Sequence, residues 1–213
     1  LDLHLIGEGR HEELWKALGS QVRTLGTSRG TSFAVWAPNA KAVRVVGDFN
    51  NWNGMSHSMR VMGGNGVWEL YIPGVSAGSK YKYEILTKFG QWITKIDPLA
   101  RHTETPPATA SVVTESNHKW NDEKWIKART KRDALKSPMS IYELHVGSWR
   151  KGLDYRSLAA ELIPYVQELG FTHVEFMPVA EHPFAPSWGY QVTGYFAPTS
   201  RFGSPDDLKF LID

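Results

Sequence analysis

Tryptophan is the residue type whose number and placement point most directly to chemistry in this chain. The 213 residues include nine tryptophans against eight tyrosines. An indole ring offers a flat apolar face on which the C–H patches of a sugar ring can stack. Trp52 and Trp92 lie in turn sequences, where a core residue is not expected. With Lys82, which projects from the polar face of a neighbouring predicted strand, they form a candidate ligand platform.

Core packing is the competing explanation for each tryptophan. It is favoured for Trp36 and Trp68, because both lie inside runs with strand character. For the platform of Trp52, Lys82 and Trp92, ligand stacking and structural packing fit the residues equally well.

The common catalytic motifs are absent from the sequence. There is no G-x-S-x-G nucleophile turn, no G-x-x-x-x-G-K-[ST] phosphate loop, no G-x-G-x-x-G after a strand and no H-E-x-x-H. Zero cysteines exclude thiolate zinc sites and disulfides. His173 and Glu175 lie two apart on a predicted strand, and a hydrogen-bonded structural role fits them better than a metal site. No metal or cofactor is expected.

The composition is that of an ordinary globular protein, with 24 Lys+Arg, 22 Asp+Glu and 41% hydrophobic residues. No run approaches the roughly 18 apolar residues of a membrane span, and no signal peptide opens the chain. The basic residues are dispersed, so neither nucleic acid nor membrane is expected as a partner. Together with the absence of cysteine, these features predict a cytoplasmic protein.

Residues 30–115 show the rhythm of an antiparallel β-sandwich. Short runs of β-branched and aromatic residues alternate with Gly, Asn and Pro clusters. In the run 80–85, Lys and Glu alternate with Tyr and Ile, so one face is polar and the other is apolar. The predicted strands are Thr31–Ala37, Ala42–Gly47, Gly66–Ile72, Lys80–Thr87, Gln91–Ile96 and Thr109–Val113.

After a polar linker at 116–138, residues 139–213 change to a β-α-β rhythm. Strands are predicted at 141–146 and 171–177, with a helix between them that Ser157 caps and Pro164 interrupts. Ser204-Pro205-Asp206-Asp207 predicts the start of a second helix. This pattern begins a parallel α/β barrel or a doubly wound sheet. The chain starts at Leu1 rather than Met and ends at Asp213 within this helix, so a fragment is expected.

Several segments of the predicted sandwich resemble the family-48 carbohydrate-binding module. They are Phe33-Ala34-Val35-Trp36-Ala37-Pro38-Asn39-Ala40, Val45-Val46-Gly47-Asp48-Phe49-Asn50-Asn51-Trp52, Gly66-Val67-Trp68-Glu69 and Tyr81-Lys82-Tyr83-Glu84. In glycogen-binding relatives of this module, two tryptophans and a lysine hold the glucan. The resemblance implies that Trp52, Trp92 and Lys82 have that role here, in an immunoglobulin-like sandwich.

The downstream half resembles bacterial 1,4-α-glucan (glycogen) branching enzymes. The resemblance is carried by the segments at 142–149 (YELHVGSW), 171–183 (FTHVEFMPVAEHP) and 187–203 (SWGYQVTGYFAPTSRFG). It implies the first two strands and helices of a truncated (β/α)8 barrel of family 13, and it makes residues 1–29 the end of a preceding N-terminal module. The partners it implies are glycogen, amylose and maltooligosaccharides, together with the remainder of the barrel.

The same resemblance implies a retaining reaction that transfers a glucan chain to a 6-hydroxyl. Such a reaction requires two carboxyl groups roughly 5 to 5.5 Å apart. In this family they follow barrel strands that the chain does not contain, so no catalytic residue is assigned and the chain alone is expected to be inactive. Tyr190 matches a tyrosine that stacks under the sugar at the cleaved subsite, and Trp188 and Gln191 belong to the same candidate substrate-binding loop.

The sequence is compatible with three related functions. The residues fit a branching enzyme best, because of the spacing between Glu181-His182-Pro183 and Gly189-Tyr190-Gln191. A related family-13 hydrolase of the trehalohydrolase or debranching type has the same layout. A stand-alone glucan-binding module is the third possibility. Glu181, His182 and Trp188 fit structural support of the loop as well as sugar contact, and Glu143, His145 and Glu175 are expected to order the barrel interior.

Overall fold

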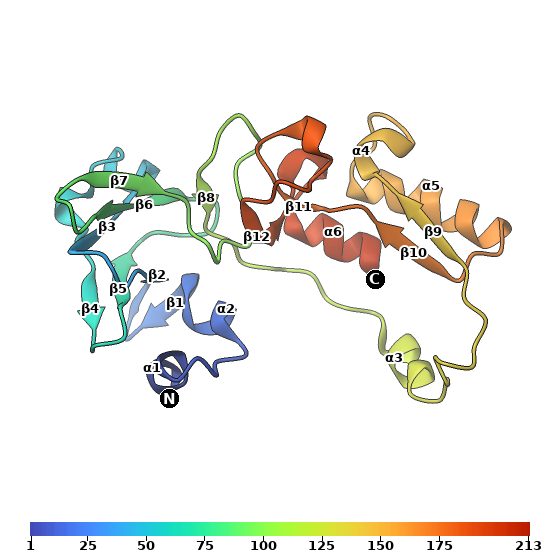
Figure 1. The fold of residues 1–213 in the computed structure, drawn as a ribbon, viewed down its shortest axis with the longest axis horizontal. Coiled ribbons are helices and arrows are strands. Elements are labelled where there is room, and N and C mark those ends of the chain that lie inside the picture. The colour runs from blue at the N-terminus through green and yellow to red at the C-terminus, as the bar shows by residue number, and fades with distance from the viewer. The chain divides into compact units, whose positions relative to one another are not determined.

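The computed structural model describes all of residues 1–213, and the chain divides into two units (Figure 1). The first contains Leu1–Glu115 and Thr193–Ala197, and the second contains Ser116–Val192 and Pro198–Asp213. No helix has both the length and the apolar character needed to cross a membrane.

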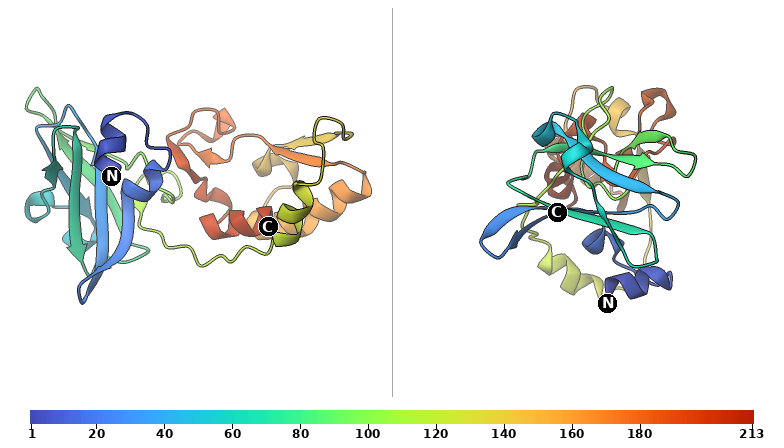
Figure 2. Two further views of the ribbon diagram at one scale, coloured as in Figure 1. Left: turned by 90° about the horizontal axis from the view of Figure 1, so that it is seen from below. Right: turned by 90° about the vertical axis from the view of Figure 1, so that its left-hand side faces the viewer.

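The first unit is built from two antiparallel sheets that lie in two layers (Figures 1 and 2). One sheet has the order β1-β2-β5-β4, and the other has the order β3-β6-β7 with β8 also paired to β6. The strands are β1 (Gly19–Leu25), β2 (Ser28–Trp36), β3 (Ala42–Gly47), β4 (Arg60–Met62), β5 (Val67–Pro73), β6 (Lys80–Leu86), β7 (Trp92–Lys95) and β8 (Ser111–Val112).

Short helices complete this unit. They are α1 (Asp2–Gly7), α2 (Leu14–Ala17), and the 3-10 turns η1 (Asp48–Asn50) and η2 (Gly54–Ser56). Ile6 and Leu14 pack on a small cluster of Leu18, Ala34 and Val67, on the face of the first sheet that points away from the sandwich core.

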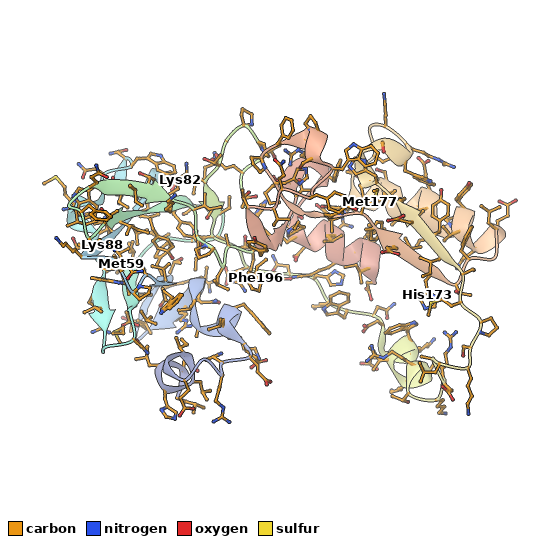
Figure 3. All side chains as sticks on the ribbon, in the orientation of Figure 1. Met59, Lys82, Lys88, His173, Met177 and Phe196 are labelled. Atoms are coloured by element: carbon orange, nitrogen blue, oxygen red, sulfur yellow. The ribbon has the colours of Figure 1, made fainter.

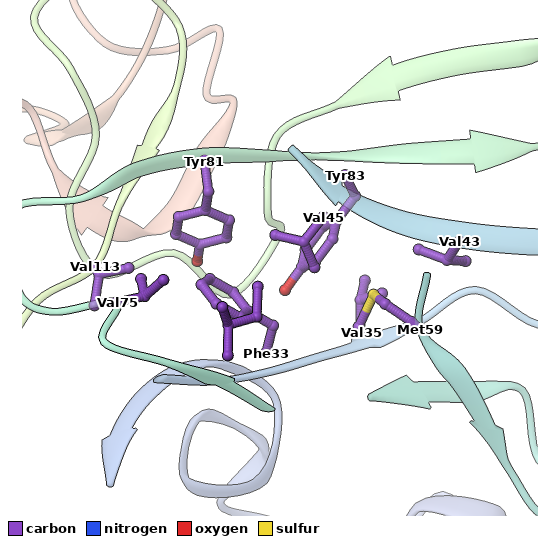
Figure 4. Packing of buried hydrophobic residues seen from close by; sticks show 10 residues of the cluster. Phe33, Val35, Val43, Val45, Met59, Val75, Tyr81, Tyr83 and Val113 are labelled. Atoms are coloured by element: carbon purple, nitrogen blue, oxygen red, sulfur yellow. The ribbon is translucent and has the colours of Figure 1, made fainter. Parts of the chain in front are cut away.

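The sandwich core follows from the alternation of the strands. Phe33 and Val35 of β2 face Tyr81 and Tyr83 of β6, and all four side chains are buried (Figure 4). Both tyrosine hydroxyls donate hydrogen bonds to the buried carboxylate of Asp97. Burial raises the pKa of Asp97 to about 6, although these hydrogen bonds oppose the shift.

The second unit has a parallel pair of strands, β9 (Ile141–Leu144) and β10 (His173–Phe176). Leu158 and Leu162 of the connecting helix are fully buried against this pair and against Leu211. The other elements of this unit are α3 (Glu123–Arg129), α4 (Val146–Trp149), α5 (Tyr155–Glu168), β11 (Ala180–Glu181), η3 (Ala185–Ser187), η4 (Ser200–Phe202) and α6 (Pro205–Ile212). Strand β12 (Gly194–Pro198) belongs to the first unit except for its last residue.

The structure confirms the predicted fold class of a mainly β chain with an antiparallel β-sandwich, which is followed by a β-α-β unit. Strand β1 and helix α3 are among the elements that were not predicted. Strand β1 lies inside the expected N-terminal segment and pairs with β2 along its whole length. Helix α3 lies inside the expected linker. Both segments have mixed polar and apolar residues, so their periodicity is weak. Pairing with β2 decides the structure of β1.

The helix starts give one correct and one wrong prediction. Ser204 caps α6, and its hydroxyl accepts a hydrogen bond from the backbone N–H of Asp207, as expected. Ser157 does not cap α5. The cap is Asp154, whose carboxylate accepts a hydrogen bond from the Ser157 N–H, while the Ser157 hydroxyl accepts one from the backbone N–H of Asp154. Both residue types cap well, and the reciprocal pair favours the earlier start.

Candidate functional site

The outer face of the second sheet carries two of the three predicted platform residues. Lys82 alternates with the buried Tyr81 and Tyr83, so it lies on the opposite face of β6 (Figure 3). Trp92 pairs with Leu86 across β7, and cross-strand partners share a face. Because Leu86 is four residues from Lys82, the two groups are about 13 Å apart along the strand. That separation exceeds one sugar ring and suits an oligosaccharide.

The polar groups of this face are held in place. The Lys82 ammonium donates to the hydroxyl of Thr109 at 2.7 Å. The Arg44 guanidinium lies 4.1 Å from the centre of the Trp92 ring, a cation–π contact that covers one face of the indole. Trp92 keeps 41% of its surface exposed. The exposed part of the ring is therefore available to a ligand.

Trp52 lies at the end of the same sheet, in a strained backbone conformation. Its N–H donates to the carbonyl of Gly47, the last residue of β3, and its side chain is 43% exposed. Its φ is 60°, and Asn51 before it has φ 51°. A non-glycine residue in this left-handed region costs roughly 1–2 kcal/mol. Such strain is retained where the placement of a side chain matters.

A second candidate site is the loop after β11, which carries Trp188, Tyr190 and Gln191. Trp188 is the third non-glycine residue with positive φ, at 54°. Its ring stacks on His145 with centroids 5.1 Å apart and planes 19° apart. Burial first, and the charge of His182 second, lower the pKa of His145 below its usual value. The stack therefore involves a neutral imidazole at neutral pH.

Tyr190 and Gln191 project from this loop into solvent. Tyr190 is 65% exposed, and Gln191 is exposed as well. Between Trp188 and Tyr190, Gly189 has φ 87° and packs against the main chain of Pro178, where a Cβ would lie 2.3 Å from the carbonyl oxygen. Only glycine fits this close approach. The three predicted substrate-binding residues are thus gathered on one constrained loop.

The base of the loop is fixed by the buried carboxylate of Glu181. One oxygen accepts hydrogen bonds from Arg201 at 2.8 Å and from the Thr199 hydroxyl at 3.1 Å. The other accepts the backbone N–H and the hydroxyl of Ser200, both at 2.9 Å. Of the two roles that the sequence left open for Glu181, structural support and sugar contact, this geometry favours structural support.

Sequence reasoning missed Arg44 and misassigned Trp36. Arg44 alternates with the buried Val43 and Val45, so the strand pattern alone could have placed it on the outer face. Trp36, expected in the core, is 57% exposed, and its indole N–H donates to the carbonyl of Asn65. The prediction was wrong because Trp36 shares the outer face of β2 with Ala34, whereas Trp68 packs on the core as expected.

No group of three His, Cys, Asp or Glu side chains in residues 1–213 is arranged to hold a metal ion. His173 instead forms a hydrogen bond with the Thr172 hydroxyl. Both candidate sites consist of aromatic rings beside hydrogen-bonding groups.

Comparison with known proteins agrees with this chemistry. Residues 17–100 match the family model of carbohydrate-binding module 48 (isoamylase N-terminal domain). This match confirms the resemblance of the sandwich to that module, and it includes strand β1.

The full chain is similar to proteins named 1,4-alpha-glucan branching enzyme GlgB. It is 62% identical over 213 residues to the protein of Leifsonia xyli and 59% identical over 217 residues to that of Thermobifida fusca. Each match covers 100% of this chain but 29% of the relative. The chain thus spans less than a third of the curated relatives it matches, and the resemblance to branching enzymes is confirmed over that part.

Solved structures of related proteins share the fold. A protein from Salmonella typhimurium assigned as an alpha amylase matches with a TM-score of 0.70 and 26% identity, over 92% of this chain and 30% of that one. A pullulanase from Bacillus acidopullulyticus matches with a TM-score of 0.67 over 92% of this chain and 27% of its own, and at 23% identity it supports the fold alone.

Proposed function

We propose that this chain is the glucan-binding part of a cytoplasmic 1,4-α-glucan branching enzyme. Such an enzyme cleaves an α-1,4 bond and transfers the released chain to a 6-hydroxyl, forming a branch. The observation that carries the proposal is the 62% identity to a branching enzyme along the full length of the chain. The nucleophile and the acid/base carboxyl of the reaction then belong to residues outside residues 1–213.

Within the chain we assign two glucan contacts. The first contact lies in residues 30–115, where Trp52, Lys82 and Trp92 bind glycogen, amylose or maltooligosaccharides. The exposed indoles supply stacking surfaces, and Lys82 supplies a hydrogen-bond donor. The left-handed backbone at Trp52 supports this assignment, because the residue keeps 43% of its surface exposed and its burial is therefore incomplete.

The second contact is the loop of Trp188, Tyr190 and Gln191, in residues 139–213. We propose that Tyr190 stacks on the sugar next to the cleaved bond, with the other two residues beside it. The loop lies after the first two strands of a barrel whose remainder is the partner that supplies catalysis. Neither nucleic acid nor a membrane is a partner in this proposal.

Activity is tested by comparing this chain with the full-length protein that contains it. Each is incubated with amylose, and iodine absorbance and the appearance of α-1,6 linkages in proton NMR are followed. The full-length protein should form branches, and the 213-residue chain should form none. Branch formation by the chain alone, or hydrolysis without new linkages by the full-length protein, would contradict the proposal.

The platform is tested by affinity electrophoresis of the 213-residue chain in gels containing glycogen. Trp52→Ala and Trp92→Ala should each weaken binding by roughly 1–3 kcal/mol, the range known for aromatic side chains that stack on nucleobases. Trp36→Ala is the matched control, because Trp36 is at least as exposed as the two platform tryptophans but lies on the other sheet. Equal retention of all three variants would favour a purely structural role for the platform.

A further inference from the structure

Glu181 is the most completely satisfied buried charge of the second unit. Its side chain is 5% exposed. Besides the hydrogen bonds from Arg201, Thr199 and Ser200, it accepts the backbone N–H of His182 at 2.9 Å. Removing a buried carboxylate from water is costly unless its oxygens are paired, and here five donors share them.

These donors come from both ends of one segment. His182 follows Glu181 directly, whereas Thr199, Ser200 and Arg201 lie 18 to 20 positions later. The Arg201 guanidinium also donates to the Pro183 carbonyl at 3.4 Å. One carboxylate therefore joins the beginning of the segment to its end.

We refer to Glu181 and its partners Thr199, Ser200 and Arg201 as the clamp. Further contacts hold its end at Thr199. The backbone N–H of Thr199 donates to the Val179 carbonyl at 2.7 Å. The buried Tyr155 of α5 donates its hydroxyl to the Thr199 carbonyl at 2.9 Å. Burial and the negative charge of Glu181 raise the pKa of Tyr155 further above its usual value, so it stays a donor. The clamp is thereby connected to the helix that forms the core of this unit.

The segment closed by the clamp carries the candidate substrate loop. Tyr190 is mostly exposed, so packing of its own ring does little to fix its position. Its placement depends on the backbone, which is held by the Trp188–His145 stack, by the contact of Gly189 with Pro178, and by the clamp. The strength with which Tyr190 stacks on a sugar ring depends on where the loop holds its side chain, so a displaced loop should weaken glucan binding.

We propose that Glu181, held by Arg201, Thr199 and Ser200, is a positioning residue that sets how Tyr190 meets the glucan. This inference rests on the proposed function. Glu181 touches no substrate in this scheme. It acts by fixing both ends of the loop. Loss of Glu181 should therefore raise the KM for glucan, because Tyr190 would no longer be held in place.

The test is a double-mutant cycle in the full-length protein, with branching of amylose as the assay. Glu181→Gln keeps the shape of the side chain but removes the charge that holds Arg201. It should raise KM by about 10-fold or more and change kcat by less than about threefold. In a Tyr190→Ala background, Glu181→Gln should cause no further rise in KM, because the group through which it acts is gone.

Glu161→Gln is the matched control. Glu161 pairs with Arg150 in the same unit, but both side chains are exposed. This variant should leave KM unchanged in both backgrounds. If Glu181→Gln does not accumulate as folded protein, Arg201→Lys is used in the same cycle, because it retains the charge and loses the two-pronged donor geometry.

Two results would overturn the positioning role. One is an equal rise in KM for the Glu181 variant with and without Tyr190, which would indicate independent effects. The other is a lowered melting temperature with unchanged KM, which would indicate structural support alone. A wild-type protein that neither binds nor branches amylose would instead refute the proposed function, so the two failures are distinguishable.

Discussion

The two units differ in how completely their sheets are covered. In the first, each strand of one sheet faces the other sheet, and ten buried residues form a shared core. In the second, β9 and β10 pair only with each other, and Ile141 and His173 at their starts are exposed. Parallel strands are normally buried on both faces. The two sheets of the sandwich therefore cover each other with strands of the same unit. The parallel pair is covered by α5 and α6 on one side.

The candidate sites reflect this difference. The platform of the first unit stands on paired strands, where the register itself places Lys82 and Trp92 on one face. The loop of the second unit depends on a clamp, a ring stack and one glycine. Strand-borne sites are intrinsically more rigid than loop-borne ones. Both sites nevertheless contain a tryptophan in left-handed conformation.

The largest expected effect is a loss of stability on removing a buried side chain from the sandwich core. Phe33→Ala removes a fully buried ring that contacts Phe49 and Tyr81. It should lower the free energy of unfolding of the first unit by about 3–5 kcal/mol, measured in urea by tryptophan fluorescence. Trp36→Ala, on the other face of the same strand, should cost no more than about 1 kcal/mol. Similar losses for both would contradict the two-faced description of β2.

Opposite pH dependence should distinguish the two units. The pKa of Asp97 is about 6 when folded and near 3.8 when unfolded, so the folded chain binds the extra proton between these values. Stability of the first unit should therefore fall as pH rises from about 4 to about 6, by about 3 kcal/mol from this group. Asp97→Asn should remove that slope, as measured by urea unfolding at each pH. An unchanged slope in the variant would refute the assignment.

Asp206 of the second unit gives the contrasting case. Burial acts against the shift, but hydrogen bonds from Ser116, the Asn117 N–H and Lys209 lower its pKa to about 2. Its contribution is present above about pH 3.8 and is lost as pH falls toward 2. Asp206→Asn should flatten that acid limb and leave the range from pH 4 to 6 unaffected.

The loop of the second unit should be sensitive to a single methyl group. In Gly189→Ala the new Cβ would meet the Pro178 carbonyl, in addition to the cost of a positive φ. Gly152→Ala isolates that backbone cost, because Gly152 has φ 85° and no atom near a Cβ. Gly152→Ala should lose about 1 kcal/mol, and Gly189→Ala about 2–3 kcal/mol, by thermal unfolding. Equal losses would show that the contact with Pro178 is not restrictive.

The smallest expected effect concerns a helix start. Ser204→Ala removes the hydroxyl that caps α6 and should cost about 1 kcal/mol, measured by urea unfolding. Ser204→Thr should restore most of it, because threonine also caps. If both variants lose the same amount, the hydroxyl is not the stabilising group.

Most of the sandwich could be predicted from the sequence, because alternation of polar and apolar residues is strong in its central strands. Ala42–Gly47 has the predicted bounds. The Ile141–Val146 strand is shorter than predicted, since Val146 begins α4. The end of a strand depends on where pairing with a neighbour stops, which a single strand's residues do not specify.

For the sites, residue type and turn context alone singled out Trp52 and Trp92, and the resemblance to known families added Tyr190. The buried pairing of Glu181 with Arg201 and the stacking of Arg44 on Trp92 needed the folded chain, because these partners lie 20 and 48 positions apart. Local periodicity is a property of neighbouring residues and is written in the sequence. Which side chains meet across the loop or the sheet is decided by tertiary packing, because only the fold brings distant residues within contact distance.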